Sequence, residues 1–284
     1  MWFILSVASA FFDSIKDVFG KKSAVHLDEY VAAWSQRVFA LVVVVPLMLL
    51  HIPAQLDREF WQALAIIVIL ATMASILYMK ALKHAPLSVV VPIASLTPVF
   101  ILATAPFINH EQPKLFGIVG VCITVVGAYV LQLSKRRDGF WKPFTSLVAD
   151  RGSRYMFGVV ILWSITSPYD KVAIQHSNPY FYVGIANLCY MLTLLPFVLT
   201  NGRLRSVFKH ARTLAPIGFG QGFAVLFQML AVPLTFVSYT TAVKRSSSIF
   251  SVAWGKWLFK EEKTPERLAG ALIILAGIIL MLVS

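Results

Sequence analysis

Two adjacent cations, Lys244 and Arg245, are the residues whose type and position most clearly suggest chemistry. They lie well inside an apolar stretch, residues 236–258. An ionisable side chain in hydrocarbon costs roughly 2.5–3.5 kcal/mol on insertion scales, so we expect both to face a wet cavity or a partner. Two neighbouring cations suit a phosphate, carboxylate or sulfate, and arginine adds a bidentate fork. The alternative is that they pair with Asp13 or Asp17 and only hold the two halves of the chain together.

A second group of charges lies in the first apolar stretch and contains Asp13, Lys16 and Asp17. Spacings of three and four residues place these side chains along one face of a helix. A carboxylate held in lipid can take up a proton during a transport cycle. The other interpretation is a local pair between Asp13 and Lys16 that neutralises itself, and the sequence favours neither.

Polar side chains in other apolar stretches are candidates for lining a cavity. Arg37 follows Trp34 by about one helical turn, and Gln221 precedes Gln228 by two turns and so shares its face. Snorkelling of Arg37 to the membrane interface and hydrogen bonds between helices are alternative explanations. The predicted substrate-binding residues are Lys244, Arg245, Asp13, Lys16, Arg37, Trp34, Tyr78, Gln221 and Gln228.

The elements that must position these side chains follow from the composition of the 284-residue chain. Hydrophobic residues make up 58% and charged residues 13%, against about 45–50% and about 25% in soluble proteins, which excludes a soluble enzyme. The apolar residues form unbroken runs, and a run of about 20 can cross a membrane as a helix. We predict ten such helices, over residues 1–20, 31–51, 60–82, 86–107, 115–133, 153–175, 178–200, 212–232, 236–258 and 266–284.

The positions of the basic residues predict the orientation of these helices. Of the 25 Lys and Arg residues, 18 lie in the loops after the odd-numbered spans, and only Arg58, Lys114 and Lys171 lie on the opposite side. Cytoplasmic loops carry the excess of basic residues, so we expect a multi-pass protein of the cell (inner) membrane with both termini outside the cytoplasm. The net charge of +12 is thereby explained without a nucleic-acid partner.

An internal repeat appears when the sequence is compared with itself at an offset of 150 residues, without a gap. The matches include proline, glycine and glutamate residues that chance rarely aligns: Pro46 with Pro196, Glu111 with Glu261, Gly120 with Gly270, and Gly127 with Gly277. Tyr78 aligns with Gln228, which places two polar side chains at matched depth. Each copy holds five spans, so the second must be inverted in the membrane, an arrangement common in alternating-access transporters. We expect repeat 1 over residues 1–134, a basic cytoplasmic linker over 135–152 and repeat 2 over 153–284.

Several segments resemble one family of transporters. They are residues 81–88 (ALKHAPLS), 95–99 (SLTPV) and 242–246 (AVKRS), together with Glu111 and the two glycine pairs. On these residues the chain resembles the drug/metabolite transporter (DMT) superfamily in its ten-helix form of two EamA-type domains. The resemblance implies the fold and a transport function over nearly the whole chain, and it leaves the substrate open.

Two charged groups resemble particular branches of this superfamily. Lys244 and Arg245 resemble a pair in the triose-phosphate branch, and Asp13 with Lys21 resembles the embedded acid and lysine of small multidrug-resistance proteins. Members are often drawn with cytoplasmic termini, whereas the charges here predict the opposite orientation.

The function that we expect is secondary active transport of a small organic anion or zwitterion, such as a phosphorylated metabolite or an amino acid, by alternating access through a central cavity. The alternatives are proton-coupled efflux of cationic or aromatic compounds centred on Asp13 and, in another class, a lipid-phosphate flippase. We expect no enzyme activity, because the motif of an intramembrane metalloprotease does not occur, and no ATP drive, because no nucleotide-binding motif occurs. We also expect no cofactor or metal. The expected partners are the substrate, a coupled proton in one alternative, and the bilayer, with the protein a monomer or a homodimer.

Overall fold

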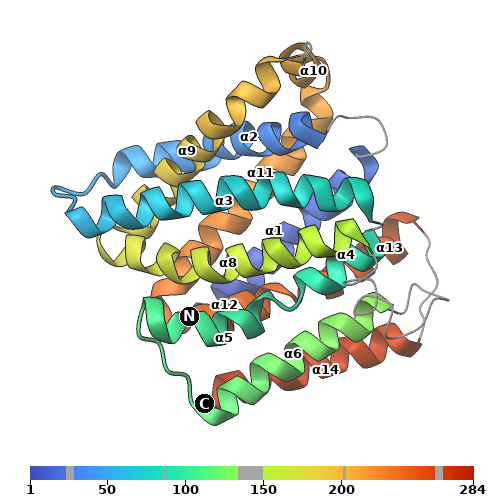
Figure 1. Ribbon diagram of the computed structural model, residues 1–284. Helices are drawn as coiled ribbons and strands as arrows, with labels where there is room; N and C mark the ends of the chain where they lie inside the picture. Colours follow the sequence, from blue (N-terminus) through green and yellow to red (C-terminus); the bar gives the residue numbers. More distant parts are fainter. Residues whose placement is uncertain (24–28, 86, 134–149, 201–202, 260–264) are drawn as a thin grey trace. The chain divides into compact units, whose positions relative to one another are not determined.

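Helices form at every apolar stretch predicted from the sequence (Figure 1). The computed structural model describes residues 1–23, 29–85, 87–133, 150–200, 203–259 and 265–284, so most of the predicted linker over 135–152 lies outside the described residues. Eight of the predicted spans are single helices: α1 (Trp2–Ser23), α2 (Glu29–Leu50), α3 (Arg58–His84), α6 (Leu115–Leu133), α8 (Arg151–Gln175), α9 (Pro179–Leu199), α11 (Ala211–Ala231) and α14 (Pro265–Val283). A short helix, α10 (Arg203–Lys209), precedes α11, and a 3₁₀ turn, η1 (Val232–Leu234), follows it.

The helices have the length and composition of membrane spans. Five helical stretches of the described residues are long and apolar enough to cross a bilayer, and two further apolar helices are shorter. Large apolar side chains face outward, among them Ile4, Phe107 and Leu115, which are 71%, 86% and 72% exposed. Such exposure is costly in water and costs nothing in hydrocarbon, so this is a multi-pass membrane protein.

Two of the predicted spans are broken in the middle, which hydropathy does not predict. Residues 86–107 form α4 (Leu87–Ala94) and α5 (Thr97–Ile108), and residues 236–258 form α12 (Val237–Lys244) and α13 (Ser247–Phe259). At each break, backbone hydrogen bonds join residues three positions apart. The Ser95 N–H donates to the Pro92 carbonyl, and at the position 150 residues later the Arg245 N–H donates to the Ala242 carbonyl. The two repeats therefore share this joint.

Hydroxyl groups compete with the helical hydrogen bonds at both breaks, and a proline adds to the first. In the first repeat, Ser95 donates to the Pro92 carbonyl at 2.6 Å and Thr97 donates to the Ala94 carbonyl at 2.7 Å. Pro98 also brings no N–H to the beginning of α5. In the second repeat, the Ser248 hydroxyl donates to the carbonyl of Arg245 at 2.7 Å and competes with the helical ladder.

The helices pack in two compact units. The first consists of residues 1–72 and 170–234, and the second of residues 73–169 and 235–284, so each draws helices from both repeats. The core of the first unit joins α2, α9, α10 and α11 through residues such as Val31, Leu194 and Leu214. The core of the second unit joins α3, α4 and α8 around residues such as Val90 and Met156.

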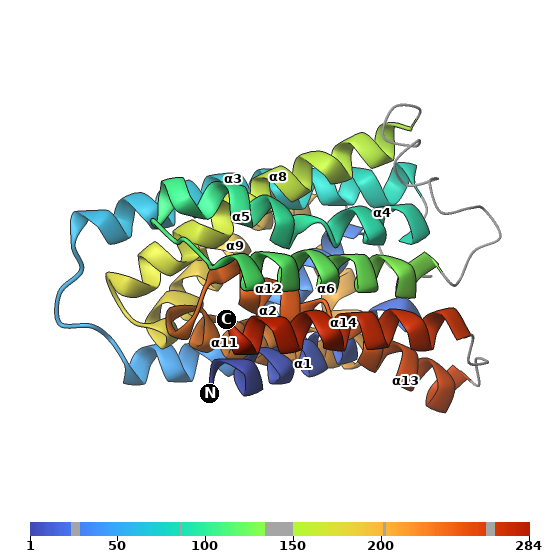
Figure 2. The same cartoon turned by 90° about the horizontal axis from the view of Figure 1, so that it is seen from below.

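In the second unit, α6 and α14 lie side by side along their length (Figures 1 and 2). Gly120 lies against Gly277, and Gly127 lies against Gly270, so residue numbers rise along one helix as they fall along the other. The helices are related by the 150-residue repeat and run antiparallel, as an inverted repeat requires. The predicted fold, an all-α membrane protein of two inverted five-helix repeats, is confirmed.

In the first unit, a polar tie joins the segment before α3 to the end of α8. Asp57 accepts hydrogen bonds from the Phe60 N–H at 3.0 Å and from His176 Nδ1 at 2.6 Å. The bond from the Phe60 N–H, together with the one from His176, lowers the pKa of the Asp57 carboxyl below its usual value. The carboxylate form is therefore the one that stabilises this tie.

With asparagine in place of Asp57, the melting temperature is expected to fall less steeply as the pH is lowered. A depressed carboxyl pKa contributes stability that is present above its unfolded value, about 4, and is lost as the pH falls through the folded value. Melting temperatures of the wild type and Asp57→Asn, measured from neutral pH downward, should converge in acid, because asparagine still caps the helix. Parallel profiles of the two proteins would contradict this role for Asp57.

Candidate functional site

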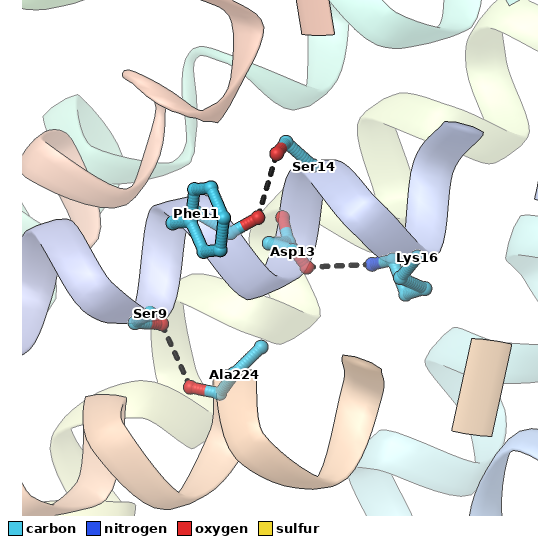
Figure 3. Close-up of polar contacts among 6 residues, drawn as sticks. All are labelled: Ser9, Phe11, Asp13, Ser14, Lys16 and Ala224. Atoms are coloured by element: carbon cyan, nitrogen blue, oxygen red, sulfur yellow. Dashed lines mark hydrogen bonds and ion pairs between the residues drawn. The ribbon is translucent and has the colours of Figure 1, made fainter. Parts of the chain in front are cut away.

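The charged pair Asp13 and Lys16 lies on α1 in the first unit. Lys16 Nζ and Asp13 Oδ1 are 2.7 Å apart, and the side chains are 22% and 14% exposed. Figure 3 shows the two pointing toward one another along one face of the helix. The local pair that the sequence allows is thus formed, while a proton-carrying role for Asp13 stays a prediction.

The helix that carries this pair packs closely on α11. The Ser9 hydroxyl donates to the Ala224 carbonyl at 2.7 Å (Figure 3), and Phe12 stacks on Phe223 and Phe227 with centroids 5.0 and 5.6 Å apart. Gln221 and Gln228 are both on α11, and the Gln221 side chain is only 9% exposed. The structure thus brings the predicted residues of α1 and α11 onto two helices in contact.

Three alternate glycines of α11 allow this packing, and the sequence analysis missed them. A Cβ on Gly220 would lie 3.2 Å from the Phe12 carbonyl oxygen of α1, and one on Gly222 would lie 3.2 Å from the Ala40 Cα of α2. A Cβ on Gly218 would come within 2.3 Å of the Phe39 Cβ. The signal is the Gly-x-Gly-x-Gly spacing, which places small residues on the sides of α11 that face α1 and α2.

Arg37 and Trp34 face α9 from α2. Arg37 Nη1 donates to Asn187 Oδ1 at 3.2 Å, and its guanidinium lies 4.9 Å from the centre of the Tyr190 ring. Trp34 is 7% exposed and donates from Nε1 to the Met191 carbonyl at 3.1 Å. Trp34 therefore ties α2 to α9, and its assignment to substrate binding stays a prediction.

Asp170 of α8 is a half-buried acid that the sequence analysis did not single out. The Tyr182 hydroxyl donates to Asp170 Oδ1, and Tyr182 of α9 is 2% exposed. The signal was available, because Asp170 is an ionisable residue five positions before the end of α8, at Gln175. This hydrogen bond joins α8 to α9, the helix that Arg37 contacts from α2.

Lys244 and Arg245 lie in the second unit, at the break between α12 and α13. Lys244 is the last residue of α12, Arg245 caps it, and both side chains are half-buried. The sequence analysis placed the pair inside one continuous helix over 236–258, whereas in the structure it lies at the end of a helix. A helix C-terminus favours cations, and the N-terminus of α13, beginning at Ser247, favours anions.

Tyr78, also in the second unit, packs on Trp163 with ring centroids 5.8 Å apart. The nine predicted residues thus fall into two groups. Lys244, Arg245 and Tyr78 belong to the second unit, and the other six belong to the first.

Glu111 holds the beginning of the helix that ends in this cationic pair. Its side chain is 7% exposed, and Oε2 accepts a hydrogen bond from the N–H of Val237, the first residue of α12, at 2.9 Å. A carboxylate at this end also complements the positive end of the helix dipole. Glu111 is therefore a positioning residue for α12.

Replacing Glu111 with alanine is expected to lower stability by about 1–2 kcal/mol, the cost of losing a helix cap. Glu111→Gln keeps an acceptor oxygen and should lose less. Thermal unfolding of the two variants in detergent measures the difference. Equal losses would show that the acceptor oxygen is not what holds α12.

One group of described residues could hold a metal ion. Ligand atoms of Asp57, Glu59 and His176 lie within 4.8 Å of one another in the first unit. The Asp57 and His176 atoms already bond each other, so we interpret the group as the polar tie described above.

Comparisons with known proteins place these observations in a family. The model of the EamA-like transporter family matches residues 1–133 and again 151–283. An uncharacterized transporter of Archaeoglobus fulgidus is 22% identical over 98% of this chain and 97% of its own length. A probable 4-amino-4-deoxy-L-arabinose-phosphoundecaprenol flippase subunit ArnE of an Enterobacter species is 38% identical, over 26% of this chain and 69% of its own. A solved crystal structure with 13% identity matches the fold with a TM-score of 0.73, over 99% of this chain and 96% of the other.

Proposed function

Because the chain belongs to the EamA-like transporter family, we propose that it is a secondary active transporter that moves a small organic anion or zwitterion by alternating access. The substrate class would be a phosphorylated metabolite or an amino acid. The observation that carries the proposal is the position of Lys244 and Arg245 at the joint of a broken helix. Broken helices hold the substrate in many transporters, because their free ends offer unsatisfied backbone groups.

The cationic pair supports an anionic group on the substrate. Arginine can bind a carboxylate or phosphate through two parallel hydrogen bonds, and lysine adds a point charge. The alternative centred on Asp13 is less well supported, because Lys16 lies 2.7 Å from its carboxylate and would compete with a cationic substrate.

A lipid-phosphate flippase is the second candidate, and the similarity to the ArnE subunit favours it. The compound in the name of that relative contains a phosphate, for which Lys244 and Arg245 are equally suited. The two candidates therefore share one recognition chemistry and differ in what the phosphate is attached to.

A thermal-shift screen of the purified protein tests the proposal. The ligands are phosphorylated sugars, amino acids, organic cations and a polyprenyl phosphate, followed by uptake into proteoliposomes for those that stabilise. We expect stabilisation by anions or zwitterions. Stabilisation by cations alone would contradict the proposal, and stabilisation by the polyprenyl phosphate alone would favour the flippase.

We further propose an inner-membrane protein, a monomer or homodimer, with the loops after odd-numbered spans in the cytoplasm and both termini outside. The excess of basic residues in those loops supports this orientation. Labelling of single cysteines introduced at exposed Lys83 and Arg58, from either side of the membrane, tests it, because the two positions should label from opposite sides.

A further inference from the structure

The short helix α10 has one apolar side and one cationic side. Leu204 and Val207 pack with the core of the first unit, and Val207 is only 2% exposed. Arg205 and Lys209 are exposed and lie four residues apart, so they share the opposite side of the helix. Arg212, the second residue of α11, is also exposed and follows Lys209 by three positions. We call Arg205, Lys209 and Arg212 the α10 cationic face.

Contacts with α2 and α9 hold the beginning of α10 in place. The guanidinium of Arg203 donates to the Phe197 carbonyl at 3.0 Å and to the Thr200 hydroxyl at 3.2 Å. It also lies 4.8 Å from the centre of the Tyr30 ring, which stacks on Phe197. The side chains of the cationic face therefore extend from a backbone that the rest of the unit positions.

The helix α10 lies at the surface of the bilayer, where one span ends and the next begins (Figure 1). The stretches Pro179–Leu199 and Ala211–Leu234 are each long and apolar enough to cross a membrane, and α10 lies between them. Leu199, the last residue of α9, is 60% exposed, as expected of a side chain in lipid. Arg205 follows it by only six residues, and long basic side chains at this depth extend their charges to the headgroups.

The charges of the cationic face are not neutralised by the described residues. The stretch 200–214 contains four Lys and Arg residues and no Asp or Glu. Within the part of the chain that the structure describes, Arg205, Lys209 and Arg212 form no ion pair and no side-chain hydrogen bond. The rule that favours basic residues in cytoplasmic loops does not require them to share one face or to lack partners. Their arrangement therefore points to an anion outside the protein.

We propose that the α10 cationic face binds the headgroup of an anionic phospholipid. The headgroup phosphate accepts hydrogen bonds from the arginine and lysine side chains, and the acyl chains lie along the exposed apolar end of α9. A zwitterionic lipid also has a phosphate, but its own ammonium group cancels the charge and makes it a weaker ligand. This inference goes beyond the proposed function, because it concerns the lipid around the protein and not the transported solute.

Native mass spectrometry of the full-length protein in mild detergent tests the inference. The probe is phosphatidylglycerol, and phosphatidylcholine with the same acyl chains is the comparison. We expect phosphatidylglycerol to bind more tightly, and its affinity to fall as the ionic strength rises. A basic residue near an anionic surface contributes about fivefold in affinity, so Arg205→Gln/Lys209→Gln should bind roughly 25-fold less tightly. Arg205→Lys keeps the charge and should retain most of the affinity.

Arg58→Gln/Lys114→Gln is the matched control, because it removes the same charge from two exposed positions outside the cationic face. The predicted topology places both on the other side of the membrane, and screening should keep the affinity within about twofold of the wild type. Melting temperatures in lipid-free detergent establish that both double variants are folded. They should stay near that of the wild type, since all four side chains are exposed.

The outcomes separate the inference from the proposed function. Equal affinities of the two double variants for phosphatidylglycerol would overturn the inference and leave the anion transporter standing. Loss of phosphatidylglycerol binding in Lys244→Ala but not in Arg205→Gln/Lys209→Gln would also overturn it and would favour the flippase. Glycerol phosphate, a soluble headgroup, is the third probe. If it binds the wild type as tightly as the lipid and is lost in the same double variant, the face takes a soluble anion and the lipid inference is wrong. Stabilisation by cations alone in the ligand screen would contradict the proposed function without affecting lipid binding at α10.

Discussion

Alanine in place of Lys244 or Arg245 is expected to weaken binding of the transported anion by roughly 10- to 100-fold. A hydrogen bond to a charged group contributes about 1.5–3 kcal/mol, and each 1.4 kcal/mol corresponds to a factor of ten. Both residues end α12 at the break in the span, where a bound anion would also meet the N-terminus of α13. Affinity for the best ligand of the screen, measured on purified protein, gives the size of the loss.

Two controls separate binding from stability in this experiment. Lys83→Ala removes an equal charge from the exposed end of α3 and should leave the affinity unchanged. The cations also stabilise the C-terminus of α12 by about 0.3–1 kcal/mol, so melting temperatures must be compared as well. Arg245→Lys keeps the charge and loses the bidentate fork, so its affinity should lie between those of the wild type and Arg245→Ala.

The contrary result is also informative. If Lys244→Ala and Arg245→Ala retain full transport while Asp13→Asn abolishes it, the anion hypothesis is wrong. Proton-coupled efflux of a cation would then be the better description, with the Asp13–Lys16 pair opening during the cycle.

Replacing Gly127 with alanine is expected to cost about 3 kcal/mol of stability, the upper part of the range for overpacking. A Cβ at this position would lie 2.6 Å from the Ile274 backbone nitrogen and 2.9 Å from the Gly270 carbonyl oxygen. Backbone atoms cannot rotate away as a side chain does, so α6 and α14 would have to separate. Thermal unfolding in detergent should show a markedly lower melting temperature.

Gly158→Ala is the matched control in the same unit. A Cβ there would meet only the Leu77 Cδ1 at 3.4 Å, an ordinary contact with a flexible side chain. Because glycine in a helix is about 0.5–1 kcal/mol less stable than alanine, this variant should be unchanged or slightly stabilised. Similar melting temperatures for the two variants would show that α6 and α14 are not held by their close approach.

The positions of the spans could be predicted well from the sequence because hydrocarbon thickness fixes their length. The stretch 115–133 coincides with α6, and α9 (Pro179–Leu199) differs from its predicted bounds by one residue at each end. The break at Arg245 was missed, since hydropathy measures transfer into lipid and does not report on backbone hydrogen bonds. A serine such as Ser248 counts as nearly neutral in that measure, yet its hydroxyl competes for a helical carbonyl.

For the candidate site, the sequence predicts which residue types are present, but it does not predict which side chains contact each other. Arg37 was identified as a cation in lipid, but its contact with Tyr190 and the bond of Tyr182 to Asp170 each join two different helices. Which hydroxyl meets which carboxylate depends on how each helix is rotated about its own axis. The apolar face of a helix fixes that rotation less precisely than a hydrogen bond requires. Trp34 was predicted to bind substrate together with Arg37, and its indole N–H donates to the backbone carbonyl of Met191.

The contact between Arg37 and Asn187 has an evolutionary consequence. The two positions are separated by 150 residues, the length of the repeat, so they are copies of one ancestral position that now face each other. In an assembly of two identical half-length chains, an arginine there would meet a second arginine, and like charges at that distance repel. Once duplication had given two copies that could change independently, one could become asparagine while the other stayed charged. Divergence of the copies therefore gave this position a freedom that a symmetric ancestor did not have.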